Sequence, residues 1–149
     1  VMVRSDNNSV YTEGESIAKK KVSDLKNRVE LVNNTDNPVL ISIHQNYFSD
    51  SRYSGAQVFY SNNYQSKQLA EIFQKAFVSN LNLGSRRQPK SGRGIYLLER
   101  VNCPAVLIEC GFLSNPQEDQ SLRSDSYQKK ISWKRLTSSS RTSVLFLSA

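Results

Sequence analysis

Two side chains that can do acid–base or metal chemistry each end an apolar run of the sequence. Val39–Ile43 is rich in β-branched residues and leads into His44, the only histidine of the chain. Ala105–Ile108 is a second apolar run and leads directly into Glu109. Such runs are typical of buried strands, and open α/β sheets bind ligands beyond the carboxyl ends of their strands. If the two strands are neighbours, an imidazole and a carboxylate meet at one sheet edge, and these are two of the groups that a metal-dependent hydrolase uses, although two residues do not fill a zinc shell.

Each of these residues also has a structural interpretation. A lone histidine is often a hydrogen-bonded structural residue, and a carboxylate at a strand end is often a helix cap or an ion-pair partner. Cys103 and Cys110 form no disulfide framework. With His44 they could form a Cys2His zinc site, although they lack the close spacing typical of such ligands. Buried or spectator thiols are the alternative.

Helical and extended patterns alternate along the chain and indicate which elements position His44 and Glu109. Apolar residues at helical spacing predict a helix over 17–32, on which Asp24 and Arg28 form a favourable pair four residues apart. A second long helix is predicted over about 65–81. Strands are predicted at 39–46, 56–60, 95–98 and 105–109. The alternation predicts an α/β layered domain, with a mostly parallel or mixed twisted sheet flanked by helices.

The two ends of the chain lack the regular patterns of the segments between them. Residues 1–4 resemble the end of a strand, so we expect the domain to be incomplete at its N-terminus. A helix is predicted from Pro116, with Asn115 as N-cap and Glu118 completing a capping box. We assign 1–131 to a partial catalytic domain. Residues 132–149 keep no helical period, and we expect a tail that is disordered or foreign to the fold.

Composition narrows the classes of function. The chain has 149 residues, 38% of them hydrophobic, and a mean hydropathy of −0.54, as expected for one globular domain. No apolar run approaches the roughly 20 residues of a membrane-spanning helix. The net charge of +7 predicts attraction to polyanions such as an anionic cell wall. Nucleic-acid binding would rest on charge alone, because the basic clusters carry no interleaved aromatic residues, and we do not predict it.

Three motifs carry a resemblance to a known family. They are the segments 42–46 (SIHQN), 54–60 (SGAQVFY) and 104–115 (PAVLIECGFLSN). Together they resemble the zinc-dependent N-acetylmuramoyl-L-alanine amidases of bacterial cell-wall turnover, and within that family the spore-germination type. The resemblance runs in order from Val1 to about Ile131, and it includes Arg4, Asp6, Asp24 and Arg28.

The resemblance implies a reaction and residues for it. The reaction is hydrolysis of the amide between N-acetylmuramic acid and L-alanine of the stem peptide, with peptidoglycan as the partner and Zn as the cofactor. It implies that His44 is a zinc ligand and that Glu109 is the catalytic carboxylate, which deprotonates water and protonates the leaving nitrogen. Asn46 is expected to bind substrate, although a turn-forming role is as compatible with its sequence. We expect a monomer located outside the cell or in the cell wall.

The sequence departs from the family pattern in two places. The family's other histidine and its glutamate ligand lie upstream of the arginine matched by Arg4, and the terminal helix expected after Tyr127 gives way to the unrelated tail. We therefore expect weak zinc binding and little activity from this chain alone. The competing hypothesis is a non-catalytic cell-wall binding module that uses the basic loop 86–93.

Overall fold

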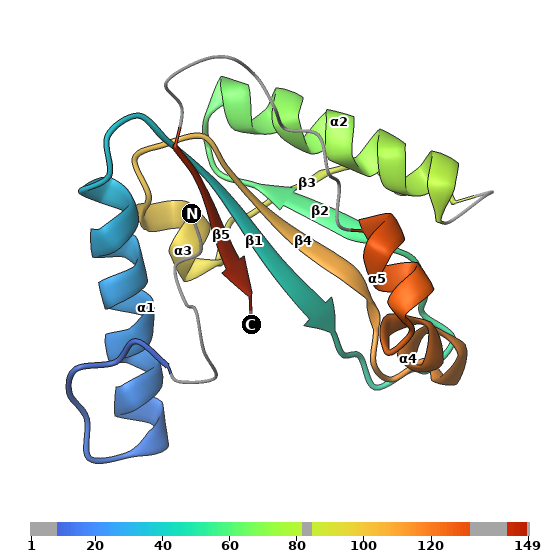
Figure 1. The fold of residues 1–149 in the computed structure, drawn as a ribbon, viewed down its shortest axis with the longest axis horizontal. Coiled ribbons are helices and arrows are strands. Elements are labelled where there is room, and N and C mark those ends of the chain that lie inside the picture. Colours follow the sequence, from blue (N-terminus) through green and yellow to red (C-terminus); the bar gives the residue numbers. More distant parts are fainter. Residues whose placement is uncertain (1–8, 82–84, 132–142, 149) are drawn as a thin grey trace.

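A mixed β-sheet is the centre of the fold (Figure 1). The computed structural model describes residues 9–81, 85–131 and 143–148, and within these ranges the sheet has five strands in the order β3-β2-β4-β1-β5. The strands are β1 (Pro38–Asn46), β2 (Gln57–Tyr60), β3 (Lys90–Ser91), β4 (Ala105–Phe112) and β5 (Ser143–Ser148). β4 and β5 run parallel to β1, whereas β2 is antiparallel to β4 and parallel to β3. The sheet is thus mixed, as the sequence predicts.

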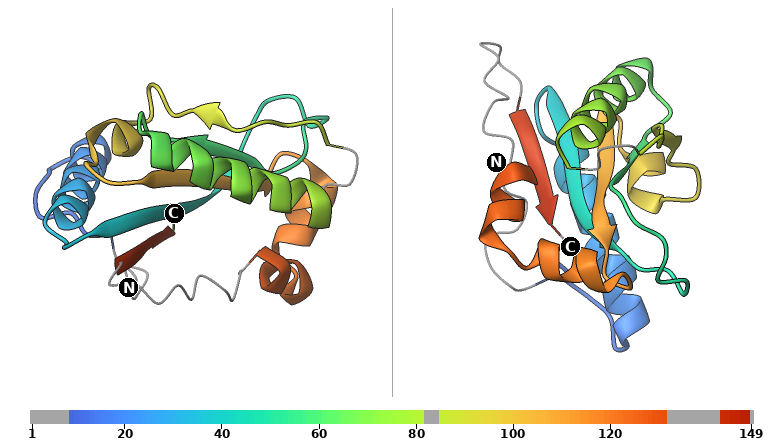
Figure 2. Two further views of the ribbon diagram at one scale, coloured as in Figure 1. Left: turned by 90° about the horizontal axis from the view of Figure 1, so that it is seen from above. Right: turned by 90° about the vertical axis from the view of Figure 1, so that its right-hand side faces the viewer.

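Helices cover both faces of the sheet, as Figures 1 and 2 show. α1 (Ile17–Asn33) and α3 (Tyr96–Arg100) pack on one face. α2 (Tyr64–Asn80), α4 (Pro116–Leu122) and α5 (Asp125–Ile131) lie on the other. The α/β layered class predicted from the alternating pattern is confirmed.

The alternation of side chains along β1 and β4 divides the core between the two faces. Leu40, Ala105 and Leu107 point toward α1 and α3. Ile41 and Val106 lie in the cluster beneath α2. Because strands buried on both faces lose the polar–apolar alternation, β1 and β4 appear in the sequence as continuous apolar runs. Those runs are therefore what makes the site strands recognisable.

A side chain of α2 extends the hydrogen bonding of β2. The carboxamide of Gln74 donates from Nε2 to Ala56 O at 3.0 Å and accepts from Val58 N at 2.8 Å. This is the pattern that a residue of a parallel neighbouring strand makes, and it continues the line of β3. Gln74 is buried, so its amide is committed to the sheet edge.

Three local expectations need correction or lie outside the described residues. Residues 95–98 are not a strand, because the short helix α3 begins at Tyr96. Glu118 does not close a capping box: Asn115 caps α4 as predicted, but the Glu118 carboxylate accepts from Gly55 N and Phe112 N. The strand predicted at 1–4 lies outside the described ranges.

The tail carries the largest local difference from expectation. Residues 143–148 form β5, whose six residues pair in parallel with Pro38–Ile43 of β1. For these six residues the expectation of disorder does not hold, since the open edge of a buried strand offers hydrogen bonds to any extended segment that reaches it. Residues 132–142 and 149 lie outside the described ranges, and the division into a domain at 1–131 and a foreign tail stays a prediction.

Candidate active site

His44 and Glu109 lie side by side on neighbouring parallel strands. Their Cα atoms are partners in the register of β1 and β4, near the carboxyl ends of both strands. Leu40, Ala105 and Leu107, at even spacings before them, belong to the core beneath α1 and α3. Because side chains alternate with a period of two, His44 and Glu109 project from that same face. The prediction that the two strands are neighbours and bring the two groups to one edge is confirmed.

The His44 ring is held by a buried hydroxyl. Its Nε2 lies 2.7 Å from Ser42 Oγ, and Ser42 is fully buried two residues earlier on the same face of β1. Burial lowers the pKa of His44, and the positive charge of Arg28 lowers it further. The imidazole is therefore neutral at pH 7. In the tautomer that donates from Nε2 to Ser42, Nδ1 keeps the lone pair that a metal ligand requires.

The Arg28 charge is fixed by Asp24. Arg28 Nε donates to Asp24 Oδ2 at 2.6 Å, and both side chains are largely buried on α1. Asp24 Oδ1 also accepts from Val10 N at 2.8 Å, which ties the segment before α1 to the helix. The predicted Asp24–Arg28 pair is thus confirmed. It also affects the candidate site, because the charge of Arg28 lowers the pKa of His44.

The Glu109 carboxylate is half buried and incompletely satisfied. Its Oε2 atom is buried and has no hydrogen-bond partner among the described residues. Burial raises the pKa of Glu109 above the ordinary value of 4.5. A carboxyl with a raised pKa exchanges a proton closer to neutral pH, which suits a general base that later acts as an acid. An unpaired buried oxygen costs about 1–3 kcal/mol, so it requires a physical explanation, and a catalytic role is one such explanation.

Asn46 lies where the register of the two strands changes. His44 pairs with Glu109, but Asn46 pairs with Phe112, so β4 carries one extra residue over this interval. The backbone carbonyl of Asn46 accepts from Leu113 N at 2.8 Å. Bulges of this kind redirect neighbouring side chains and are frequent beside active sites. The substrate-binding role of Asn46 stays a prediction.

The loop of residues 47–56 between β1 and β2 is fixed to the segment that follows Glu109. Asn115 Nδ2 donates to Ser51 O at 3.0 Å and to Tyr53 O at 3.3 Å. Glu118 Oε1 accepts from Gly55 N at 2.8 Å, where Gly55 has a positive φ of 92°. The loop and the end of β4 therefore form one unit. Sequence reasoning missed these contacts because they join residues about 60 positions apart.

The described residues do not by themselves complete a zinc site. They hold no group of three or more His, Cys, Asp or Glu side chains placed to bind one ion. Cys103 precedes β4 and Cys110 lies within it, near its carboxyl end, which places them roughly 20 Å apart for an extended chain of that length. The Cys2His alternative is therefore excluded for these residues. His44, with its second ring nitrogen ordered by Ser42, fits one ligand of a metal site, and one ligand is too few.

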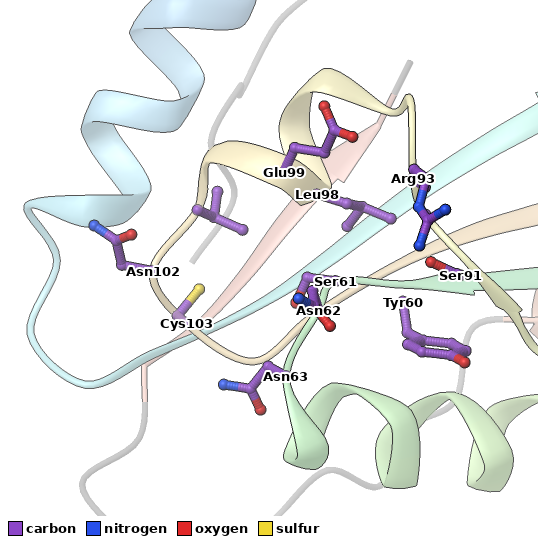
Figure 3. A pocket seen from close by; sticks show the side chains of 12 residues that line it. Tyr60, Ser61, Asn62, Asn63, Ser91, Arg93, Leu98, Glu99, Asn102 and Cys103 are labelled. Carbon is purple, nitrogen blue, oxygen red and sulfur yellow. The ribbon is translucent and has the colours of Figure 1, made fainter.

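Two cavities lie at different ends of the sheet. One of about 650 Å³ lies between the sheet, α1 and α3, and is lined by His44, Ser42 and Arg28 among others; Glu109 is not among its lining residues. The other, of about 500 Å³, lies at the amino end of β4 and is lined by polar residues including Arg93 and Glu99 (Figure 3). The first cavity, at the His44 face, is the one that belongs to the candidate site.

The basic loop 86–93 is partly committed to the fold. Arg87 donates from Nη2 and Nε to Ser54 O at 2.8 and 3.1 Å, and its guanidinium lies 5.5 Å from the centre of the Phe112 ring. Arg86 and Arg93 are exposed. One of the arginines assigned to wall binding by the competing hypothesis thus holds the 47–56 loop in place.

Two further residues of the site were not assigned a role from sequence. Ser42 contacts His44, and Gln57 is the antiparallel register partner of Glu109 on β2. The period-two alternation of β1 is a signal that could have found Ser42, because a polar residue two positions before His44 must share its face. Nothing local in the sequence places Gln57 beside Glu109.

Two neighbouring parallel strands thus present a neutral imidazole and a half-buried carboxylate at one edge of an α/β sheet. The family model for N-acetylmuramoyl-L-alanine amidases (Amidase_3) matches residues 1–138, and the chain belongs to this family of enzymes. Members of the family are generally metal-dependent. The resemblance stated from the three motifs is thereby confirmed at the level of the family.

Two similar curated proteins come from Bacillus subtilis. The chain is 37% identical over 133 residues to the germination-specific N-acetylmuramoyl-L-alanine amidase of Bacillus subtilis (strain 168), covering 88% of this chain and 56% of that protein. It is 29% identical over 109 residues to the amidase LytC of the same organism, covering 71% and 22%. The chain thus spans little more than half, or less, of these curated relatives.

A solved structure has the same fold. The CwlD amidase from Clostridioides difficile, in complex with the GerS lipoprotein, matches with a TM-score of 0.82 and 40% identity, over 87% of this chain and 68% of that one. An N-acetylmuramoyl-L-alanine amidase from Clostridium difficile 630 matches with a TM-score of 0.64 and 35% identity, over 72% of this chain and 58% of that one.

No helix among the described residues is long and apolar enough to cross a membrane.

Proposed function

We propose that the protein to which this chain belongs is a peptidoglycan hydrolase that cleaves the amide between N-acetylmuramic acid and L-alanine of the stem peptide. One observation carries the proposal: His44 and Glu109 are register partners on parallel strands, and the half-buried Glu109 carboxylate has a buried Oε2 without a hydrogen-bond partner among the described residues. Membership of the amidase family supports it.

Each proposed role follows from the surroundings of the residue. Glu109, whose pKa is raised by burial, takes a proton from the attacking water and gives it to the departing alanine nitrogen. His44, neutral and ordered by Ser42, serves as a metal ligand. Asn46, at the bulge beyond His44, hydrogen-bonds the substrate.

We propose zinc as the metal of the whole protein. The described residues supply one imidazole and no complete ligand set, so the proposal relies on the family's other histidine and glutamate, expected upstream of the position of Arg4. The chain studied by itself is then expected to bind zinc weakly and to hydrolyse little.

We propose that the protein works at the cell wall, as peptidoglycan hydrolysis requires, and as a monomer. Germination is the proposed setting, because a relative is named germination-specific. A lipoprotein partner is a further proposal, since the CwlD amidase was solved with one.

The test uses a longer chain in which the segment preceding the matched region of the Bacillus subtilis relative is joined to Val1. We expect this chain to bind zinc and to release stem peptides from peptidoglycan. Glu109→Gln is expected to abolish release while zinc content is kept, whereas His44→Ala is expected to lower zinc content. Release that persists unchanged in Glu109→Gln would remove Glu109 from the mechanism.

The competing wall-binding hypothesis makes a different prediction. Binding of the chain to peptidoglycan would be lost when Arg86 and Arg93 are neutralised and would be unaffected by His44→Ala. Both arginines are exposed and available for such contacts.

A further inference from the structure

The 47–56 loop presents aromatic side chains to solvent next to the candidate site. Tyr47 is 72% exposed, and Phe48 and Tyr53 are each 47% exposed. Phe48 and Tyr53 pack edge to face with their ring centres 4.7 Å apart, and Tyr53 lies 6.2 Å from Phe112. Aromatic residues are enriched at interaction sites relative to the rest of the protein surface, so a group of exposed aromatic side chains in one segment indicates such a site. We call Tyr47, Phe48 and Tyr53 the aromatic platform.

The platform is held rigidly relative to Glu109. Ser114 Oγ accepts from Phe48 N at 3.2 Å, and Asn115 donates to the carbonyls of Ser51 and Tyr53. These anchors follow directly after β4, which carries Glu109 (Figure 1). A loop fixed by so many hydrogen bonds needs little ordering when it binds a ligand, and this preorganisation favours affinity.

The platform is electrically neutral. Its loop contains one acidic and one basic residue, Asp50 and Arg52, and these form an ion pair with a distance of 2.7 Å. The neighbouring Arg87 is committed to Ser54 O and to the face of Phe112. Stem peptides carry free carboxylates, which a neutral aromatic surface does not attract, whereas N-acetylated sugars are uncharged and offer C–H faces that stack on aromatic rings.

We propose that the aromatic platform is a glycan subsite that binds neutral N-acetylated sugar rings of the substrate. The proposal rests on the proposed function, because it assumes that the amide beside Glu109 belongs to a sugar–peptide polymer. Tyr47 directly follows Asn46 at the carboxyl end of β1, so a polymer with its amide at Glu109 continues over this rim of the sheet. In this arrangement the sugar rings on one side of the amide lie on the 47–56 loop, and the stem peptide on the other side extends away from that loop.

The test measures binding without hydrolysis. The probe is a peptide-free N-acetylglucosamine tetramer, titrated into the isotope-labelled chain and followed by backbone amide NMR. We expect shifts concentrated in residues 47–55. Tyr47→Ala and Tyr53→Ala are expected to weaken binding about fivefold or more, the loss that one stacked ring accounts for. Tyr64→Ala is the matched control: this tyrosine is 76% exposed at the amino end of α2, and binding should be unchanged.

The possible outcomes separate the proposal from the proposed function. Absence of loop shifts at saturating tetramer, or equal affinity in Tyr47→Ala, overturns the glycan subsite even if the longer chain hydrolyses peptidoglycan. Shifts of the loop with free stem peptide and not with the sugar also overturn it, and would assign the platform to peptide; the same holds if only a protein partner protects the loop. Tyrosine-dependent sugar binding without any amide hydrolysis by the longer chain supports the subsite and contradicts the amidase function.

Discussion

The half-buried carboxyl of Glu109 links the stability of the fold to pH. Burial raises its pKa above 4.5, so the folded chain holds this proton more tightly than the unfolded chain does. Unfolding then releases a proton at pH values between 4.5 and the folded pKa. Its contribution to stability is fully present below pH 4.5 and is lost as pH rises through the folded pKa.

Glu109→Gln is expected to remove the loss of stability that the parent shows as pH rises through the folded pKa of Glu109. The difference in unfolding free energy between the variant and the parent should therefore grow in favour of the variant from about pH 4 to about pH 8. Urea denaturation across this range measures it. The difference between the two proteins is measured because His44 also makes stability depend on pH. Its lowered pKa gives a contribution opposite in sign to that of Glu109, and this contribution is present in both proteins and cancels in the difference. Glu71→Gln, at an exposed position of α2, is the control, and a constant difference for Glu109→Gln would contradict the prediction.

The Asp24–Arg28 pair should matter far more than a similar pair at the surface. Arg28→Met leaves Asp24 charged and largely buried without its partner, which we expect to cost about 3 kcal/mol. Arg123→Met breaks a pair of the same spacing and chemistry, Asp119–Arg123, but there the arginine is mostly exposed, and we expect a loss of about 0.5 kcal/mol. Denaturant unfolding of both variants measures the contrast, and equal losses would show that burial does not set the strength of the inner pair.

Among single residues, sequence could locate the groups that do chemistry but not all of their partners. His44 and Glu109 could be found because each ends an apolar run, and a parallel sheet aligns such ends. Ser42 shares the face of His44 by simple alternation and could have been assigned. The contact between Glu118 and Gly55 could not, because it depends on the 47–56 loop folding back over the end of β4.

At the scale of elements, the long patterns predicted well, as did the short strand at 56–60 and the helix from Pro116, whereas residues 95–98 were assigned the wrong type. α1, α2, β1 and β4 follow from sustained periodicity or continuous apolar runs. Residues 95–98 are apolar over a length that fits a strand or a helical turn equally well. The helix forms because Leu97 and Leu98 are buried there against the sheet, while Glu99 and Arg100 stay exposed. Tertiary burial, which the local sequence does not encode, decides such cases.

Gln74 supplies an element-scale prediction. Gln74→Leu fills the space but leaves the buried N–H of Val58 without the carboxamide oxygen that accepts from it at 2.8 Å. A buried donor left unsatisfied costs about 2 kcal/mol, and we expect a loss of at least this size in urea denaturation. Gln68→Leu, the same change on the exposed face of α2, should alter stability by less than about 0.5 kcal/mol. Similar values for the two variants would mean that the carboxamide does not serve as part of the sheet.

For the whole molecule, the completeness of the candidate site depends on residues that lie outside the region shared with the relatives. The relatives are longer than the matched region, and the described residues bring together one histidine and one glutamate but no complete set of metal ligands. Charge and composition could exclude a membrane-spanning helix but could not predict which segment lies along the free edge of β1. The structure places β5 there, in parallel register with β1, so the completeness of the sheet depends on residues that no pattern marked as part of the fold.

Deleting residues 132–149 tests what β5 does for the molecule. β1 carries buried residues on both faces, and without β5 its edge from Pro38 to Ile43 would offer unpaired backbone groups to other chains. Exposed edges of apolar strands promote edge-to-edge association. We therefore expect the shortened chain to lose stability and to form dimers or larger species in sedimentation experiments, in proportion to concentration. Leu145→Pro in the full chain should act in the same direction, because proline cannot donate to the ladder. A shortened chain that stays monomeric and as stable as the parent would show that β5 is dispensable, and would return residues 132–149 to the role of a tail outside the fold.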